Sequence, residues 1–344
     1  MEWYGPLVAM KALTSVTIYA VAERAGVSIA TVSRALRDPG LVAAATRARV
    51  EEAVAALNFT PSRLGRSLAE GRHAANGIVF PDLVGPYYAE VLLGYEEAAA
   101  ELGRSVLILG TRGRADPTAQ VLDLAGRVDG LVVMGQTVAD EVVASIVAGG
   151  LPVVLLARPP ALDCDTDTVT AENEVSAAGL ARHLLDHGYR RFAFLGDPAG
   201  SPDVAGRYTG VAAALSDAGV RPPAPVRCGF DVTAGYDAAV ALLKRRTRPH
   251  AVICANDEVA LGVQEACADR GLDVPADLAL AGWDDIMTAR FVGLTTVRQP
   301  MRKLGATAAR WLHERILSPS SPPHRKVLPT QLVVRRSCGT HAQD

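Results

Sequence analysis

The sequence lacks the marks of a secreted, membrane-spanning or disulfide-bonded protein. Its five cysteines, at positions 164, 228, 254, 267 and 338, are odd in number and include no C-x-x-C pair. Such scattered cysteines predict neither a disulfide framework nor a zinc site, and they favour a reducing cytoplasm. No apolar run reaches the roughly 18–20 residues that a membrane-spanning helix needs. We therefore expect a cytoplasmic protein with no membrane partner.

The first residues do not resemble a secretory leader. Residues 1–15 have neither a basic start nor an adequate apolar core, which makes them a poor signal peptide. We expect a disordered tail over residues 1–16, with Met1 and Met10 as candidate starts of the natural chain.

Catalytic and metal-binding motifs are also missing. No Ser/His/Asp or Cys/His set can be read from the sequence. His183 and His187 stand four positions apart, but the glutamate of an H-E-x-x-H motif is absent because Leu184 follows His183. The better interpretation of this pair is a half-exposed helix end before Gly188. The sequence thus predicts no enzyme, no cofactor and no metal site.

Charge and composition indicate a globular protein with one basic end. The 344 residues are 49% hydrophobic, which suits two or three folded domains. The net charge is only -2, but residues 1–73 hold nine Lys and Arg against six Asp and Glu. The remaining chain holds 26 basic against 31 acidic residues. A basic module on an acidic body fits a nucleic-acid contact at one end.

Residues 17–36 have the pattern of two short helices joined by a tight turn. Apolar residues at i, i+3, i+4 and i+7 predict one face of the first helix; they are Ile18, Val21, Ala22 and Ala25. Gly26 ends this helix, and Ser28 can cap the next one by accepting from its free backbone N–H groups. Three apolar residues are predicted to face inward from the second helix: Val32, Ala35 and Leu36. Together these features predict a DNA-binding helix-turn-helix.

A third helix closes this small all-α headpiece, which we expect over residues 17–61. Its apolar face is predicted to hold Val50, Ala53, Val54 and Leu57, and its end lies near Asn58.

The run Val27-Ser28-Ile29-Ala30-Thr31-Val32-Ser33-Arg34 resembles the headpiece of the LacI/GalR family of bacterial transcriptional repressors. The resemblance extends over nearly the whole chain. It implies that eleven residues contact DNA: Thr17, Tyr19, Ser28, Ile29, Ala30, Thr31, Ser33, Arg34, Arg37, Arg63 and Leu68. Ile29, Ala30 and Arg34 would read base edges.

Two segments near the headpiece depend on this resemblance. Residues 62–73 match the hinge helix of the family, which folds on operator DNA, and Leu68 matches the leucine that is wedged into the minor groove. A simple linker is the alternative. The family caps its third helix with Ser or Thr, but Ala43 stands here, so we expect that cap to be missing or moved.

From Asn76 onward, short apolar runs alternate with helical segments. Such βαβ units predict parallel sheets with helices on both faces. The expected strands are residues 78–80, 106–109, 131–133 and 153–156 in one series, and residues 192–195, around 226, 252–254 and 278–280 in a second. Two doubly wound lobes resemble the periplasmic sugar-binding fold of the family. We expect one lobe at about 74–170 and 298–328, and the other at about 171–297 and 329–338.

Ligands of such folds bind at the carboxyl ends of the strands, between the lobes. The positions that match the effector contacts of the family are Asp82, Tyr88, Gln136, Asp203, Arg207, Phe230, Asn256 and Asp284. Their carboxylate, amide and guanidinium groups suit the hydroxyls of a sugar, although each position could instead be a strand-end cap or a surface loop. Ala157 stands where the family often has an aspartate, which predicts a different effector from that of the best-known sugar repressors.

We therefore predict a homodimeric transcriptional regulator, a repressor of a carbohydrate-use operon, that binds a pseudo-palindromic operator on double-stranded DNA. A small sugar-like effector would modulate the binding. Four alternatives remain open: a nucleobase or nucleoside effector, a partner protein as effector, a solute-binding protein that feeds a transporter, and an enzyme on a doubly wound fold.

Overall fold

The computed structural model describes residues 16–60, 73–160 and 165–339. The chain divides into two compact units, residues 1–73 and residues 74–344, and each is described by itself. Most of the predicted tail and hinge, including Arg63 and Leu68, lies outside the described residues.

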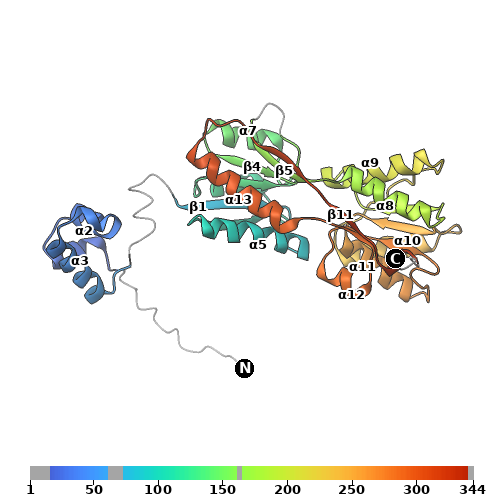
Figure 1. Ribbon diagram of the computed structural model, residues 1–344, viewed down its shortest axis with the longest axis horizontal. Coiled ribbons are helices and arrows are strands. Elements are labelled where there is room, and N and C mark those ends of the chain that lie inside the picture. The colour runs from blue at the N-terminus through green and yellow to red at the C-terminus, as the bar shows by residue number, and fades with distance from the viewer. Residues whose placement is uncertain (1–15, 61–72, 161–164, 340–344) are drawn as a thin grey trace, which may run out of the picture. The chain divides into compact units, whose positions relative to one another are not determined.

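The first unit is a helix-turn-helix with a third helix packed against it (Figure 1). Its elements are α1 (Ile18–Ala25), α2 (Ile29–Arg37), a 3-10 turn (Pro39–Leu41) and α3 (Ala44–Leu57). Gly26 ends α1 in the left-handed conformation, with φ of 62°. Ser28 caps α2, because its hydroxyl accepts from the backbone N–H of Thr31 at 3.2 Å. The predicted turn and cap are confirmed.

A compact apolar core holds the three helices together. Val21, Val32 and Val50 are fully buried, and Phe59, which follows α3, closes the core. The inward placement predicted for Leu36 is wrong, since it is 36% exposed. Leu36 lies about 100° round the helix from the buried Ala35, in the last turn of α2, so it points away from α1 and α3.

Helix α3 begins without a side-chain cap, as the sequence predicts. Ala43 occupies the cap position, and its methyl side chain has no oxygen to accept from the free N–H groups of the first turn. Such a loss costs about 1 kcal/mol of helix stability.

The second unit contains two lobes. The N-terminal lobe is built on a six-stranded parallel sheet in the order β10-β5-β4-β3-β1-β2. Its strands are β1 (Ala75–Phe80), β2 (Ser105–Gly110), β3 (Leu131–Met134), β4 (Val153–Leu156), β5 (Asp167–Ala171) and β10 (Arg325–Leu328).

Helices cover both faces of this sheet. Helices α5 (Pro86–Glu101) and α13 (Met301–Leu317) pack on one face, and α6 (Pro117–Ala125) and α7 (Asp140–Ala148) pack on the other. Helices α5 and α13 cross closely at Gly94, where a Cβ atom would lie 2.0 Å from the carbonyl oxygen of Arg302. Only glycine permits this approach.

The C-terminal lobe has a three-stranded parallel sheet, β6 (Phe192–Leu195), β7 (Ala251–Cys254) and β8 (Ala279–Ala281). Helices α8 (Glu174–Asp186) and α9 (Pro202–Asp217) share one apolar core with the sheet. Helices α10 (Val232–Leu243), α11 (Asp257–Ala268) and α12 (Met287–Val292) share the other. The predicted doubly wound architecture is confirmed.

The strand predicted around residue 226 does not form in the described part of this lobe. Val226 makes only an isolated bridge with Leu195. Pro222, Pro223 and Pro225 precede it, and proline has no N–H group to donate to a strand partner.

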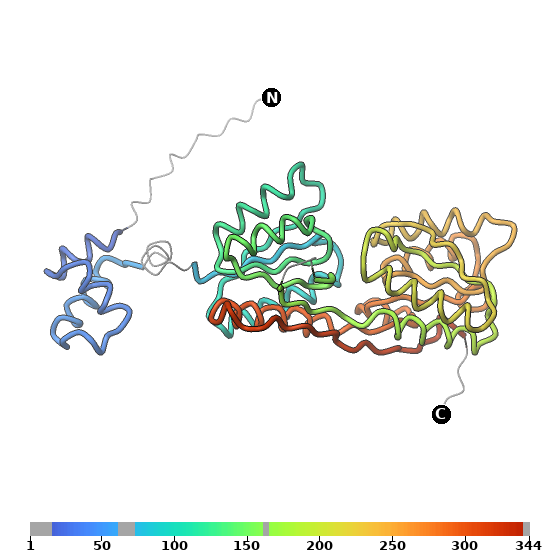
Figure 2. Tube along the Cα trace, turned by 90° about the horizontal axis from the view of Figure 1, so that it is seen from above, coloured from blue at the N-terminus to red at the C-terminus, as the bar shows by residue number. Residues whose placement is uncertain are grey.

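The chain passes between the lobes three times (Figure 2). It leaves β5 for α8 at residues 171–174, returns between β9 (Thr296–Arg298) and α13, and passes again between β10 and β11 (Gln331–Val333). Strands β9 and β11 pair antiparallel with each other, so two of the three crossings are joined by a short ribbon. A 3-10 turn (Arg336–Cys338) follows β11.

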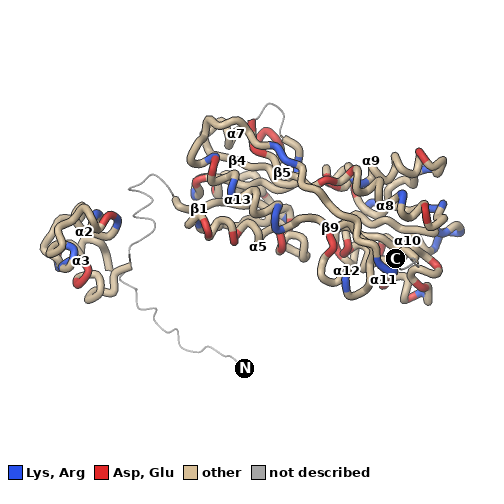
Figure 3. Tube along the Cα trace, viewed as in Figure 1, with Lys and Arg blue, Asp and Glu red and all other residues tan. Residues whose placement is uncertain are grey.

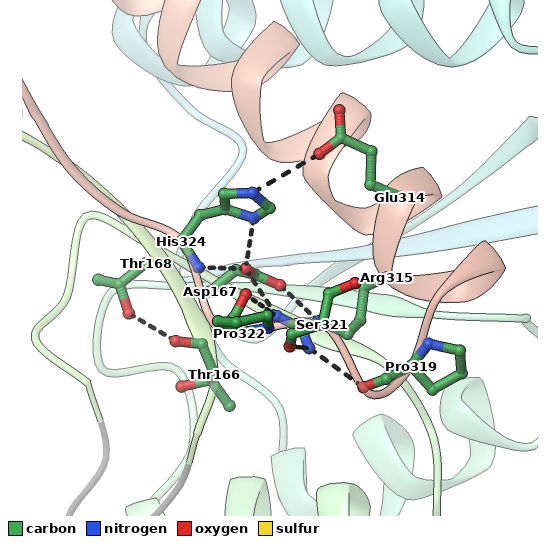
Figure 4. Close-up of polar contacts among 9 residues, drawn as sticks. All are labelled: Thr166, Asp167, Thr168, Glu314, Arg315, Pro319, Ser321, Pro322 and His324. Carbon is green, nitrogen blue, oxygen red and sulfur yellow. Dashed lines mark hydrogen bonds and ion pairs between the residues drawn. The ribbon is translucent and has the colours of Figure 1, made fainter.

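A buried carboxylate joins three elements at the edge of the large sheet (Figure 4). Asp167, at the start of β5, is fully buried. It accepts from Nε and Nη2 of Arg315, on α13, at 2.9 and 3.0 Å. It also accepts from the backbone N–H of His324 at 2.7 Å, just before β10. This ion pair ties the late segments α13 and β10 to the rest of the lobe.

Candidate functional site

In the first unit, the exposed side of α2 carries the predicted base-reading residues. Ile29, Ala30 and Arg34 are exposed, and Tyr19, in α1, is 68% exposed. Basic and acidic residues are interspersed over this unit (Figure 3). A short helix whose N-terminal residues and outer face are open to solvent has the form of a major-groove reader.

Other predicted DNA-contacting residues also have structural partners. The hydroxyls of Ser28 and Thr31 lie 2.9 Å apart while Ser28 caps the helix. Nε of Arg37 donates to Asp38 at 3.0 Å, and Ser33 is half-buried. Thr17 precedes α1 and is exposed. Ser28 and Thr31 therefore shape the turn, and the exposed residues of α2 are the ones placed to touch bases.

In the second unit, a cavity of about 320 Å³ lies between the lobes. All eight predicted effector residues line it. Three come from the N-terminal lobe: Asp82, Tyr88 and Gln136. Five come from the C-terminal lobe: Asp203, Arg207, Phe230, Asn256 and Asp284. Residues up to 202 positions apart in sequence therefore meet at one place, where the carboxyl ends of parallel strands face each other.

Arg207 is held rigidly in the cavity wall. Its Nε donates to Oδ1 of Asn173 at 2.8 Å, and its Nη1 donates to the carbonyl of Ala255 at 2.5 Å. The guanidinium also lies over Trp283, 4.7 Å from the ring centroid, and only 5% of the residue is exposed. Asn173 in turn donates to Asp203 at 2.9 Å. These contacts fix a cation in the cavity before any ligand arrives.

Asp284 follows the C-terminal lobe sheet and is nearly buried. Nε2 of Gln299 donates to its carboxylate at 2.6 Å. Burial raises the pKa of Asp284 to about 7, although Arg207 and the hydrogen bond from Gln299 oppose the rise. Its φ of 111° is strained for a residue with a side chain, and such strain concentrates at functional sites.

Two predicted residues also serve as local caps. Asn256 caps α11 by accepting from the backbone N–H of Val259 at 3.0 Å, and its amide donates to the carbonyl of Phe230 at 2.7 Å. Asp82 accepts from the backbone N–H groups of Leu83 and Val84 at 2.7 and 3.2 Å. Capping and lining the cavity are compatible, since each side chain retains further hydrogen-bonding capacity.

Several residues that were not predicted also line the cavity: Tyr87, Arg112, Asp231, Glu258 and Gln299. Arg112 pairs with Asp82 and lies 3.8 Å from Asp231. Burial raises the pKa of Glu258 to about 7, and the nearby carboxylates Asp231 and Asp82 add to the rise. A position just after a strand is the sequence feature that could have indicated a cavity residue. Arg112 has this feature because it follows β2, whereas Glu258 lies inside the first turn of α11 and lacks it.

The charge of the cavity is predominantly acidic. Among the described residues, its lining contains five carboxyl groups, of Asp82, Asp203, Asp231, Glu258 and Asp284, and two guanidinium groups, of Arg112 and Arg207. Ala157 also lines the cavity, in place of a further carboxylate. Such a site can accept many hydrogen bonds from hydroxyl or N–H groups, and those of its carboxyl groups that are ionised repel anions.

Comparisons with known proteins agree with this architecture. Residues 17–62 match the model described as bacterial regulatory proteins, lacI family. Residues 181–338 match the model described as periplasmic binding protein-like domain. The HTH-type transcriptional repressor PurR of Glaesserella parasuis is 32% identical over 333 residues, which cover 93% of this chain and 98% of that protein. Catabolite control protein A of Priestia megaterium is 33% identical and covers 87% of this chain and 92% of that protein.

Solved structures are also similar to most of this chain. The lac repressor dimer bound to operator and the anti-inducer ONPF has a TM-score of 0.82 at 28% identity, over 94% of this chain and 99% of that chain. The complex of the transcriptional regulator CelR with cellobiose has a TM-score of 0.69 at 28% identity, with the same coverage.

A helix-turn-helix headpiece and a two-lobed core with an inter-lobe cavity define a DNA-binding transcriptional regulator rather than an enzyme. The full-length relatives share this class. The chain belongs to the LacI family of bacterial regulatory proteins. No helix in the described part of the chain is both long and apolar enough to cross a membrane.

Proposed function

We propose that this chain is a cytoplasmic, homodimeric repressor whose operator binding responds to a neutral, polyhydroxylated effector of the sugar class. The observation that carries the proposal is the convergence of eight predicted residues on one cavity rich in carboxyl groups. Hydroxyl groups of a sugar can donate to these carboxylates and accept from the fixed guanidinium of Arg207. The volume of the cavity suits a small molecule.

The excess of carboxyl groups over guanidinium groups also favours ligands without negative charge. A phosphorylated sugar would bring negative charge toward Asp82, Asp203, Asp231, Glu258 and Asp284. The two arginines of the described lining would offset that repulsion in part. We therefore expect neutral sugars and polyols to bind more tightly than their phosphates.

A nucleobase or nucleoside is the second candidate effector. Full-length relatives named PurR favour it. The cavity offers aromatic side chains, of Tyr87, Tyr88 and Phe230, against which a planar base could stack. Carboxylates can also accept from the N–H groups of a base.

On the DNA side, two headpieces would read two half-sites of a pseudo-palindrome, with one α2 in each major groove. The solved lac repressor dimer, which is bound to operator, supports this arrangement. Ile29 and Ala30 would contact thymine methyl groups, and Arg34 would contact a guanine.

A thermal-shift screen of the full chain tests the effector class. Neutral sugars, polyols, sugar phosphates, purine bases and nucleosides are compared at equal concentration. A ligand that binds only the folded state raises the melting temperature. We expect neutral sugars or polyols to raise the melting temperature of the wild type but not that of Asp284→Asn. A rise with purine bases or nucleosides alone would replace the sugar by the second candidate.

A further inference from the structure

A cluster of three metal-ligand side chains lies in the C-terminal lobe, apart from the residues that line the cavity. His183 and His187 stand on successive turns at the end of α8, and Cys338 comes from the 3-10 turn after β11. The potential ligand atoms of the three residues all lie within 4.8 Å of one another. Nε2 of His183 is 3.3 Å from Sγ of Cys338. On sequence alone, the four-residue spacing of the histidines is discounted as a metal site because the glutamate of H-E-x-x-H is missing, and nothing in the sequence places Cys338 beside α8.

The turn that carries Cys338 is anchored from several sides. The hydroxyl of Ser337 donates to the carbonyl of Leu280 at 2.6 Å and accepts from the backbone N–H of Thr295 at 2.8 Å. The hydroxyl of Tyr189 donates to the carbonyl of Cys338 at 3.1 Å. Oγ1 of Thr295 lies 2.9 Å from Sγ of Cys338. The hydroxyl of Thr295 also donates to the carbonyl of Arg335 at 2.8 Å. The cysteine is therefore positioned by its surroundings, as the ligands of a metal site need to be.

The chain continues past Cys338 in a way that leaves room for the His187 ring. Gly339 has φ of 126°, and a Cβ atom there would lie only 3.1 Å from Nδ1 of His187. Cys338 is fully buried, whereas both histidines are partly exposed. The two histidines thus form the more exposed side of the cluster, and the thiol forms its inner end.

We infer that His183, His187 and Cys338 form a binding site for a divalent transition metal ion, with Zn²⁺ as the best chemical match. One thiolate and two imidazoles are borderline-soft ligands that suit Zn²⁺ in tetrahedral geometry, with the fourth position open to water. Bond lengths of about 2.0–2.3 Å require tetrahedral ligand atoms to be about 3.3–3.8 Å apart. The two histidine rings pack edge to face, with centroids 4.9 Å apart, and His187 also stacks on Tyr189. Metal binding would close the remaining distance by turning these rings. The thiol of Cys338 releases its proton to solvent as it becomes the thiolate ligand.

The ion would fasten the end of β11 to α8. Thr295, which contacts Cys338, leads directly into β9, and β9 pairs with β11 at the crossing between the lobes. The metal would therefore stabilise the C-terminal lobe at the point where its last segment meets the chain that crosses to the other lobe.

The test is a titration of the purified, chelator-treated full chain with Co²⁺, followed by displacement with Zn²⁺. We expect one Co²⁺ per chain, a thiolate-to-cobalt charge-transfer band, and the intense visible bands of tetrahedral cobalt. Cys338→Ser should abolish the charge-transfer band. His183→Gln and His187→Gln should each weaken binding by at least about 10-fold, the lower end of what loss of an outer-shell partner costs. Cys228→Ser and His250→Gln, which alter the same residue types elsewhere in the lobe, should bind as the wild type does.

Melting temperatures keep this test independent of folding defects. Without metal, the exposed-side variant His187→Gln should melt near the wild type. Zn²⁺ should raise the melting temperature of the wild type and leave that of Cys338→Ser unchanged. Cobalt binding without a charge-transfer band, or binding that survives Cys338→Ser at wild-type affinity, would overturn the proposed site.

Discussion

At the scale of single residues, the inter-lobe cavity is lined by charged side chains, some of which are largely buried from solvent. Asp284 sits in a strained conformation, is nearly buried and is held by Gln299. Arg207 is fixed by Asn173, by the carbonyl of Ala255 and by the ring of Trp283. A ligand that enters this site therefore meets oriented partners, so it loses little affinity to ordering the protein.

The first prediction concerns the effector response. Asp284→Asn keeps the size of the side chain and tolerates positive φ, but removes the negative charge. We expect operator affinity to stay within about threefold of wild type and the effector concentration at half-response to rise at least about 10-fold, the ~1.4 kcal/mol of a weak charged hydrogen bond. Operator binding is measured with and without effector. A variant that responds at the wild-type concentration would remove Asp284 from the site.

The second prediction concerns pH. Burial raises the pKa of both Asp284 and Glu258 to about 7. Carboxyl groups of an unfolded chain titrate near pH 4. Between about pH 4 and pH 7 the folded protein therefore binds more protons than the unfolded chain, and its free energy of unfolding falls as pH rises through that window.

Through these two groups, we expect the ligand-free chain to have a higher melting temperature near pH 5 than near pH 8. Glu258→Gln should reduce the difference by removing one of them. Glu101→Gln, an exposed surface change, is the matched control. If Glu258→Gln and wild type lose the same number of degrees over this range, Glu258 does not titrate as described.

The third prediction concerns base readout. Arg34 is exposed on α2, and an arginine there can donate two hydrogen bonds to a guanine. Arg34→Ala should cost ~1–3 kcal/mol at one base position of each half-site. Arg24→Ala, in the last turn of α1, changes the same charge and serves as the control. Gel-shift titrations on operators with single base changes decide the matter, and an unchanged base preference would exclude Arg34 as a reader.

At the scale of elements, the sequence predicts those helices, strands and turns that are determined by residues close together in the chain. It does not predict those that depend on contacts with residues far away in the chain. The apolar runs of β1, β3 and β6 and the Gly26 turn are of the first kind. Strands β5 and β10 are of the second, since β5 alternates threonine with apolar residues and pairs with β10 across 157 positions.

The candidate site divides in the same way. Residues directly after apolar strands, such as Asp82 and Asp284, could be named from sequence because parallel strands end at one edge. Gln299 and Glu258 could not, because their places depend on the path of β9 and on the start of α11. Cys338 could not be recognised as a neighbour of His183 for the same reason.

The fourth prediction concerns the buried ion pair between β5 and α13. Asp167→Ala removes the carboxylate and leaves the guanidinium of Arg315 without it. Breaking a buried pair in this way costs about 3–5 kcal/mol of the free energy of unfolding. Arg310 lies on α13 like Arg315, but its ion pair with Glu101, at the end of α5, is exposed. Arg310→Ala should therefore cost no more than about 1 kcal/mol. Urea unfolding of the three proteins measures both, and equal costs would contradict this assignment.

At the scale of the whole core, three chain crossings connect the two lobes while the cavity lies between them. A ligand that contacts both lobes favours the arrangement of the lobes in which it can make both sets of contacts at once. The effector can shift this equilibrium only by its difference in affinity for the two arrangements. The approach of Arg112, in the N-terminal lobe, to Asp231, in the C-terminal lobe, reaches across the cavity and is therefore a contact that closure would change.

The same crossings determine when each lobe can fold during synthesis. The N-terminal lobe needs α13 and β10, which are translated after the entire sheet of the C-terminal lobe. Until then the apolar face of β3, β4 and β5 that α13 covers stays open, and Asp167 lacks Arg315. Domains usually fold in the order in which they are synthesised. Here the N-terminal lobe emerges first from the ribosome but cannot finish folding until α13 and β10 have been synthesised. A messenger truncated near codon 298 would thus yield two unfinished lobes rather than one finished lobe.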